Sequence, residues 1–258
     1  MELIDTHTHL HWDAFEADRE AVLQRAREAG VVQIITLGTD VASSRTSVEI
    51  AGQHPPVFAA VGIHPTEAHL ARPGDVERIR KLAVTHEKVV AIGEIGLDFY
   101  RDTSHYQAQY DIFREMLYLA RRLDLPVVIH NRKAHREMEW FFQEEGFFHL
   151  KGVMHCFSGD RTDARFYLDM GLHISFTAEI TRKHFRRRDV VEYVPLDRLL
   201  IETDSPFIPP AQFPKQRNEP AFVVHVARAL AEIRKLPVED IARMTTENAR
   251  RLFGLPPF

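Results

Sequence analysis

Short runs of apolar and β-branched residues recur along the chain, and polar segments separate them. Each run is almost continuously apolar and does not alternate with polar residues, as is typical of strands buried on both faces of a parallel sheet. The runs cover residues 3–4, 31–37, 57–63, 89–95, 126–130, 152–157, 172–176 and 199–203. The pattern therefore predicts eight buried strands.

The segments between these runs have helical periodicity. Val22, Ala26 and Ala29 are spaced i, i+4 and i+7 with charged residues between them, and residues 113–120 repeat this spacing. Residues 237–254 are expected to form a final helix. Strands and helices thus alternate along the whole chain, which is typical of an α/β protein with a parallel sheet.

Eight strand–helix repeats in 258 residues favour a (β/α)8 TIM barrel, a fold of about 250 residues. We expect one domain covering residues 1–258, with a long functional loop at the Pro-rich residues 206–220. An open, doubly wound sheet is the alternative. No Gly-rich dinucleotide loop and no P-loop motif follows a predicted strand, which weighs against nucleotide-binding versions of that sheet.

Composition excludes several other classes of protein. The chain is 45% hydrophobic and 27% charged, as in soluble globular domains, and its single Cys excludes a disulfide scaffold. The net charge of −4 argues against a globally basic nucleic-acid binder. We find no targeting signal and no apolar stretch of about 20 residues, so a cytoplasmic protein without membrane contact is expected. The 15 His residues are the unusual feature, since His is the commonest metal ligand.

Ionisable side chains end most of the predicted strands. In a barrel, the carboxyl ends of the strands open onto one face, where the active site forms. In chain order these side chains are His7, His9, His64, Glu94, Asp98, His130, Arg132, His155, Glu202 and Asp204. His7 and His9 are two residues apart and would point the same way from a strand. Four imidazoles and two carboxylates at one mouth predict a metal site, and their number favours two divalent cations.

The full set of motifs is more specific than any one of them. In chain order they are DTHTH at 5–9, GIHP at 62–65, GEIGLD at 93–98, HNRKA at 130–134, HCFSG at 155–159, ETDSP at 202–206, RNEP at 217–220 and TENARRLF at 246–253. Together they resemble the TatD family of metal-dependent deoxyribonucleases, and the resemblance covers the whole chain in the right order.

The resemblance implies two metal ions that share Glu94 as a bridging ligand. The implied ligands are His7, His9, Glu94 and Asp204 for the first ion, and Glu94, His130 and His155 for the second. Several relatives in the wider hydrolase superfamily use a modified lysine as the bridge, and Glu94 already supplies a carboxylate. A mixed set of His and carboxylates accepts Mg²⁺, Mn²⁺ or Zn²⁺.

The implied activity is phosphodiester hydrolysis, with a preference for single-stranded DNA and a 3′–5′ exonuclease pattern. A hydroxide activated by two metals would attack phosphorus, and Asp204 would orient the nucleophile and take its proton. His64 is assigned to a phosphate oxygen or the leaving group. Arg132 would clamp a phosphate, and Tyr100 and Arg217 are further candidate substrate contacts. The sequence departs from the family at residues 176–178, where Phe-Thr-Ala replaces a frequent run ending in Gly.

Three questions stay open at this level. The basic residues 182–188 are either a solvated helix face or a patch that contacts the phosphate backbone. The same dinuclear site would also suit a deacylase or esterase acting on aminoacyl-tRNA, or a lactone hydrolase. A non-catalytic barrel that binds metal or a partner is the third reading, although every expected ligand position is filled. We expect a monomer.

Overall fold

The computed structural model describes residues 1–101 and 104–257, and its eight parallel strands form one sheet in chain order. The strands are β1 (Leu3–Thr8), β2 (Val31–Leu37), β3 (Val57–Val61), β4 (Val89–Asp98), β5 (Val127–Arg132), β6 (Gly152–Met154), β7 (His173–Phe176) and β8 (Leu199–Ile201). A parallel bridge between Thr8 and Ser205 joins the first strand to the segment after the last. The predicted TIM barrel is confirmed, since a doubly wound sheet has a different strand order.

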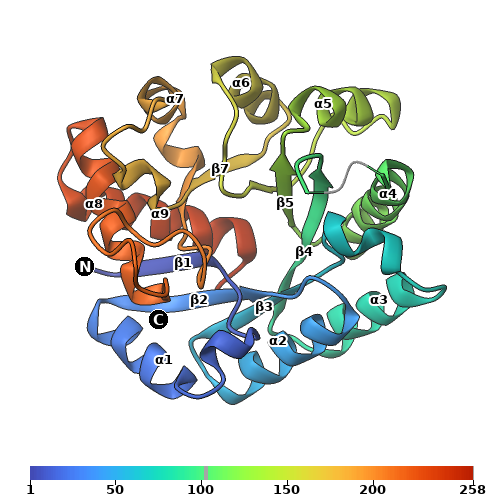
Figure 1. Ribbon diagram of the computed structural model, residues 1–258, viewed down its shortest axis with the longest axis horizontal. Coiled ribbons are helices and arrows are strands. Elements are labelled where there is room, and N and C mark those ends of the chain that lie inside the picture. The colour runs from blue at the N-terminus through green and yellow to red at the C-terminus, as the bar shows by residue number, and fades with distance from the viewer. Residues whose placement is uncertain (102–103, 258) are drawn as a thin grey trace.

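Helices follow the strands and surround the barrel (Figure 1). The α-helices in the described part of the chain are α1 (Arg19–Glu28), α2 (Val41–Gln53), α3 (Asp75–Thr85), α4 (Tyr106–Leu123), α5 (His135–Glu144), α6 (Arg161–Asp169), α7 (Arg188–Tyr193), α8 (Val223–Arg234) and α9 (Val238–Phe253). Short 3-10 helices lie at Asp13–Phe15, Pro65–Leu70, Ala178–Thr181, Leu196–Arg198 and Pro220–Phe222. The helical segments at 22–29, 113–120 and 237–254 are therefore confirmed.

The boundaries of three elements differ from the sequence pattern in ways that affect the site. β4 continues to Asp98, so Glu94 lies inside a strand. β6 ends at Met154, so His155 lies in the loop after it. Most of the basic residues 182–188 form a loop before α7, which begins only at Arg188. The interpretation of that basic segment as a helix face is therefore wrong.

Two apolar layers hold the barrel together. Inward residues such as Ile4, Val128 and Leu200 pack inside the barrel, and a larger cluster lies between the strands and the helices. Leu252 and Phe253, in the last turn of α9, belong to the inner layer. The chain after β8 therefore returns to the amino end of the barrel and partly closes it, while the carboxyl end stays open for polar side chains.

A buried carboxylate fixes the position of β1 against the segment after β8. Asp5 accepts hydrogen bonds from the backbone N–H of Thr203 at 2.9 Å and from its hydroxyl at 2.6 Å. One residue further, the N–H of Asp204 donates to the carbonyl oxygen of His7 at 2.9 Å. These hydrogen bonds within the fold therefore set the spacing between the HxH motif and Asp204.

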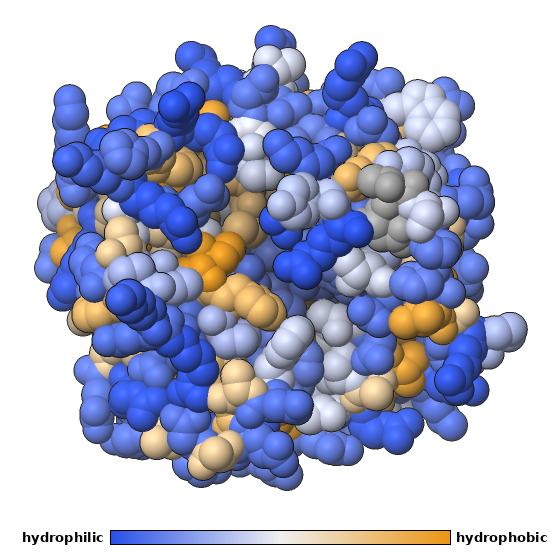
Figure 2. Space-filling view, viewed as in Figure 1, coloured by the Kyte–Doolittle hydropathy of each residue, from blue (hydrophilic) through white to orange (hydrophobic). Residues whose placement is uncertain are grey.

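The surface fits the composition. The face shown in Figure 2 is largely hydrophilic, with isolated hydrophobic side chains and a hollow near its centre. Among the described residues, no helix combines the length and the apolar character that a membrane crossing requires.

Candidate metal centre

The six predicted metal ligands and His64 converge at the carboxyl ends of six strands. His7 and His9 come from the end of β1, Glu94 from β4 and His130 from β5, while the others follow β3, β6 and β8. Their side chains are at most 16% exposed. The strand polarity of the barrel alone brings together residues that are nearly 200 positions apart in the chain.

One oxygen of Glu94 faces the HxH motif and Asp204. Glu94 Oε2 lies 3.5 Å from Nε2 of both His7 and His9. Asp204 Oδ1 lies 3.4 Å from His9 Nε2 and 3.7 Å from His7 Nε2. The two imidazole nitrogens are themselves 3.2 Å apart. These four side chains therefore surround one small space.

The other oxygen of Glu94 faces a second set of imidazoles. Glu94 Oε1 lies 2.9 Å from His130 Nδ1, 3.0 Å from His155 Nε2 and 3.5 Å from His64 Nε2. His155 Nε2 and His130 Nδ1 are 3.4 Å apart. Glu94 thus stands between two groups of nitrogen ligands and presents a different oxygen to each.

The donor set fits divalent cations. Three groups of side chains have ligand atoms close enough to hold a metal ion: His7 with His9 and Glu94, His7 with His155 and Asp204, and Glu94 with His130 and His64. His9 Nδ1 donates to the carbonyl oxygen of Leu37 at 3.2 Å, so the neutral ring directs the lone pair of Nε2 into the space shared with His7. A cation in this buried space would accept that lone pair, and carboxylate and imidazole are the ligands that Zn²⁺ and Mn²⁺ accept.

Two further carboxylates orient the imidazoles from behind. Asp98 Oδ2 lies 3.1 Å from His130 Nε2, and Glu202 Oε1 lies 3.1 Å from His155 Nδ1. Both carboxylates are almost completely buried. Glu202 Oε1 also accepts a bond of 2.7 Å from the backbone N–H of Cys156. Such carboxylate–histidine pairs fix the ring orientation and the tautomer of metal ligands.

The electrostatics keep the carboxylates ionised. Burial by itself raises the pKa of Glu94, but the charges of His155, His64 and His7 outweigh it and hold the pKa well below the usual range. Burial also opposes ionisation of Asp98, and hydrogen bonds from His130 and from backbone N–H groups lower its pKa to about 2. Burial lowers the pKa of His7, whereas at His155 burial is outweighed by the charges of Glu94 and Glu202, which hold the pKa well above its usual range. A bound cation would take the place of the proton on such an imidazole.

Strained backbone surrounds the cluster. Asp204, Cys156 and Lys133 have left-handed φ values of 56°, 43° and 59°, and each directly follows a strand that carries a predicted ligand or lies next to such a ligand. Residues other than Gly adopt this conformation at a cost that the surrounding structure must offset. At Asp204 the strain coincides with a predicted metal ligand. We infer that the strain contributes to aiming these side chains.

Two predicted substrate contacts lie together, and the third has other partners. The guanidinium of Arg132 lies over the ring of Tyr100, 4.0 Å from its centroid, and Tyr100 is 60% exposed. The guanidinium of Arg217 instead binds both carboxylate oxygens of Asp18 at 2.8 Å and lies over the ring of Phe15. Arg132 and Tyr100 thus form a stacked pair beside the ligands, while the main bonds of Arg217 stabilise the fold.

Sequence reasoning missed an aromatic pair next to the HxH motif. Trp12 and Phe207 meet edge to face with ring centroids 5.1 Å apart, and Phe207 lies 6.0 Å from the ring of His9. Both side chains are at least 40% exposed. The position of Trp12 just after His9, and of Phe207 inside the expected functional loop, was the available signal.

Comparisons with known proteins agree on one family. The family described as TatD related DNase matches residues 4–254. A metal-dependent hydrolase of Bacillus subtilis, YabD, whose function is uncharacterised, is 40% identical over 98% of this chain and 99% of its own length. A protein of Musicola paradisiaca named 3′-5′ ssDNA/RNA exonuclease TatD is 38% identical and covers 98% of both chains.

A solved structure agrees with the fold. The crystal structure of YjjV, a TatD homologue from Escherichia coli, superposes with a TM-score of 0.92 at 35% identity and covers 98% of both chains. The agreement extends over the whole barrel, so the strand ends that carry the ligands are part of the shared structure.

Proposed function

We propose, from the premise that this chain belongs to the TatD family of metal-dependent hydrolases, that it cleaves phosphodiester bonds of single-stranded DNA with two divalent cations. Similar proteins named 3′-5′ ssDNA/RNA exonuclease are 36–38% identical, which supports removal of nucleotides from the 3′ end. The carboxylate and imidazole arrangement supports hydrolysis of an ester bond.

The position of Glu94 is the observation that carries the proposal. Its Oε2 faces His7 and His9, while its Oε1 faces His130 and His155. A carboxylate that divides two sets of ligands in this way could hold one divalent cation with each of its oxygens. When bound, two divalent cations would stabilise negative charge on the phosphate and lower the pKa of a water molecule.

Asp204 is the residue that we assign to the attacking water. Its Oδ1 faces the same space as Glu94 Oε2 across the two imidazoles of the HxH motif. Burial raises the pKa of Asp204, but the hydrogen bond from His9 and the charges of His7 and His155 outweigh it and lower the pKa. An ionised carboxylate at this position accepts a proton from water and orients it toward phosphorus.

His64 suits the role of a proton donor. Its Nδ1 accepts a bond of 3.2 Å from the backbone N–H of Thr66, which leaves the proton of the neutral ring on Nε2. That Nε2 points toward Glu94 Oε1 at 3.5 Å, at the edge of the second ligand set. An N–H here donates to a phosphate oxygen or to the leaving oxygen. The spacing of His64 to Glu94 and His130 would also allow a metal ion there, and we assign His64 the substrate role because its Nε2 carries the proton.

The exposed groups around the mouth suit a single strand. Arg132 would bind a phosphate in a bidentate manner, with its orientation held by Tyr100. The rings of Tyr100, Trp12 and Phe207 offer stacking surfaces that unpaired bases reach and paired bases do not. Arg217 remains a predicted substrate contact, through the part of its side chain that is exposed to solvent.

The substitution Asp204→Asn tests the assignment of the water-activating carboxylate. We expect a fall in kcat of about 10²–10³-fold, because the amide keeps the size of the side chain and cannot accept the proton. Asp169→Asn is the matched control, since Asp169 lies on the exposed face of α6. Circular dichroism and metal analysis of both variants check the fold and the ions. Wild-type turnover in Asp204→Asn would exclude this role.

Digestion of end-labelled substrates tests the substrate class. With bound metals identified by mass spectrometry, 5′-labelled single-stranded DNA should give a ladder that shortens from the 3′ end, and duplex DNA should react more slowly. RNA, aminoacyl-tRNA and a lactone panel are assayed in parallel, with Glu94→Ala as the inactive control. Faster deacylation or lactone hydrolysis than DNA cleavage would overturn the proposal in favour of that reaction.

A further inference from the structure

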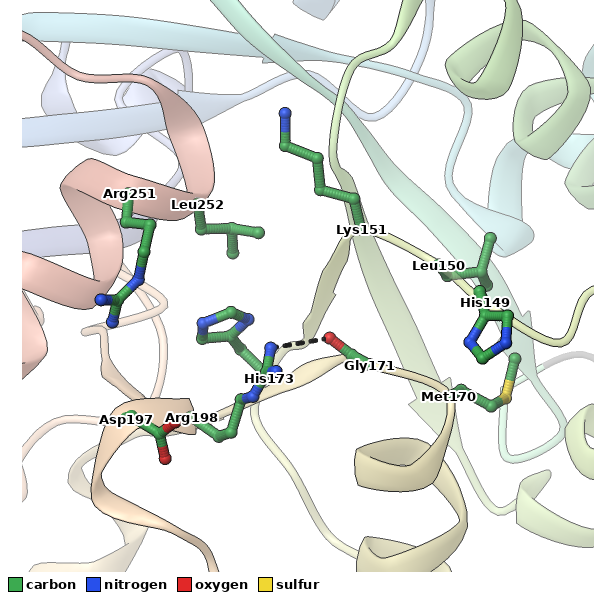
Figure 3. A pocket seen from close by; sticks show the side chains of 10 residues that line it. All are labelled: His149, Leu150, Lys151, Met170, Gly171, His173, Asp197, Arg198, Arg251 and Leu252. Atoms are coloured by element: carbon green, nitrogen blue, oxygen red, sulfur yellow. Dashed lines mark hydrogen bonds between the residues drawn. The ribbon is translucent and has the colours of Figure 1, made fainter.

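A second pocket lies at the amino end of the barrel, away from the ligand cluster. Its volume is about 560 Å³, and it is formed by the segments that lead into β6, β7 and β8 together with the last turn of α9. Figure 3 shows that its side chains come from segments distant in the sequence, with Lys151, Arg198 and Arg251 on different sides. None of these residues belongs to the site described above.

His173 is a buried and weakly partnered group in the lining of this pocket. It opens β7, is paired in register with the inward-facing Val153, and is 5% exposed. Among the described residues, neither ring nitrogen makes a hydrogen bond of standard geometry, and the backbone of Gly152 is only a weak partner. A buried imidazole without strong partners costs free energy that a bound ligand would recover. Because His173 lines the pocket, a ligand bound there could form hydrogen bonds with its ring nitrogens.

The charged residues of the lining are mostly cations. The lining holds three cationic side chains, Lys151, Arg198 and Arg251, and one carboxylate, that of Asp197. One donor of Arg198 binds the carbonyl oxygen of Gly171 at 3.2 Å, which anchors the guanidinium at the edge of the pocket (Figure 3). Burial, and then the charge of Arg198, lowers the pKa of His173 to about 4. The pocket therefore combines a positive rim with a neutral ring that offers one donor and one acceptor.

We propose that this pocket binds a small anion that carries a phosphate group, with the guanidinium groups of Arg198 and Arg251 on the side of the phosphate, the ring of His173 as a further donor and Lys151 at the outer rim. Two guanidinium groups and an ammonium exceed what one carboxylate needs, and they match the several oxygens of a phosphate. The volume lies within the usual range for small-molecule sites. The proposal is independent of the reaction at the other end of the barrel.

Calorimetric titration of the metal-loaded protein with glycerol 3-phosphate and with inorganic phosphate tests the site. We expect Arg198→Gln, Arg251→Gln and Lys151→Gln each to weaken binding at least fivefold. The charge-matched control is Arg45→Gln, an exposed position on α2, and its affinity should stay within twofold of wild type. The titration is repeated in Glu94→Gln, so that phosphate bound at the metal centre is separated from phosphate bound here.

A second measurement follows His173 directly. With ¹³C-labelled histidine, the ring resonance that is missing in His173→Gln should shift when glycerol 3-phosphate is added. Lys151 is exposed, so its substitution tests the pocket even if an arginine variant fails to fold. An unshifted His173 resonance, wild-type affinity in Lys151→Gln, or equal affinity for succinate would each overturn the proposal.

Discussion

The two ends of the barrel hold buried polar groups of opposite character. At the carboxyl end, Glu94 and Asp204 are ionised among imidazoles whose nitrogens converge on each other. At the amino end, a neutral His173 lies beneath cations and makes no hydrogen bond of standard geometry among the described residues. The first set has the donor atoms that suit a cation, and the second has the positive charge that suits an anion.

The difference shows how one scaffold supports two kinds of site. Parallel strands all present their carboxyl ends at one face, so the ligands there lie on strands or just after them and are held tightly. At the amino end the cations stand on loops and on the last turn of α9, and two of them, Lys151 and Arg251, are exposed. The carboxyl end is therefore organised before a ligand binds, while the rim of the amino end can adjust to one.

The largest expected effect comes from Glu94, the proposed bridge between two metal ions. Glu94→Gln should reduce hydrolysis of single-stranded DNA by about 10³-fold or more and lower the bound metal well below two ions per chain. Glu115→Gln, an exposed position on α4, is the control. Activity and metal content close to wild type would show that the two ligand sets do not depend on this carboxylate.

Glu202 tests whether the carboxyl end depends on buried partners of its ligands. Glu202→Gln leaves an oxygen that still accepts from Cys156 N–H, and it removes the charge behind His155. We expect metal affinity to fall by about 10–100-fold, measured by competition with a chelator. An unchanged affinity would mean that His155 is oriented by packing alone.

The pH dependence of stability tests the amino end. The folded state keeps His173 neutral down to about pH 4, while the unfolded chain binds a proton near pH 6.5. The unfolded state therefore binds more protons in this range, and stability falls as the pH is lowered from 6.5 to 4. Between pH 6.5 and pH 4, the free energy of unfolding should fall by about 2 kcal/mol less in His173→Gln than in the wild type. Urea unfolding at both pH values measures this difference. Parallel profiles for the two proteins would contradict the buried neutral state.

The smallest expected effect concerns the basic loop beside the carboxyl end. Arg187 already pairs with Glu179 at 3.2 Å, and Arg188 lies 4.0 Å from Glu232, so Arg186 has the least compensated charge. Neutralising Arg186, Arg187 and Arg188 should weaken binding of single-stranded DNA a few-fold and reduce its salt dependence. If both the affinity and the salt dependence stay unchanged, the loop does not contact the phosphate backbone.

Much of the barrel and of its carboxyl end could be predicted without coordinates. Continuous apolar runs identify the buried strands, and strand direction then places His7, Glu94 and His155 at one mouth. The pattern was weaker at boundaries, because an apolar run does not show where pairing with neighbouring strands stops. For this reason β6 was expected to continue past His155 and the basic segment was given a helical alternative.

The local sequence thus determines the strands, their direction and the kinds of ligand at their ends, because these depend on residue type and on period along the chain. The tertiary structure decides which oxygen of Glu94 faces which imidazole, and it assigns Arg217 to Asp18. It also decides that His173, Arg198 and Arg251 line the same pocket at the amino end of the barrel. Those contacts join residues far apart in the chain, and their geometry follows from closure of the barrel and packing of α9, which no local pattern encodes.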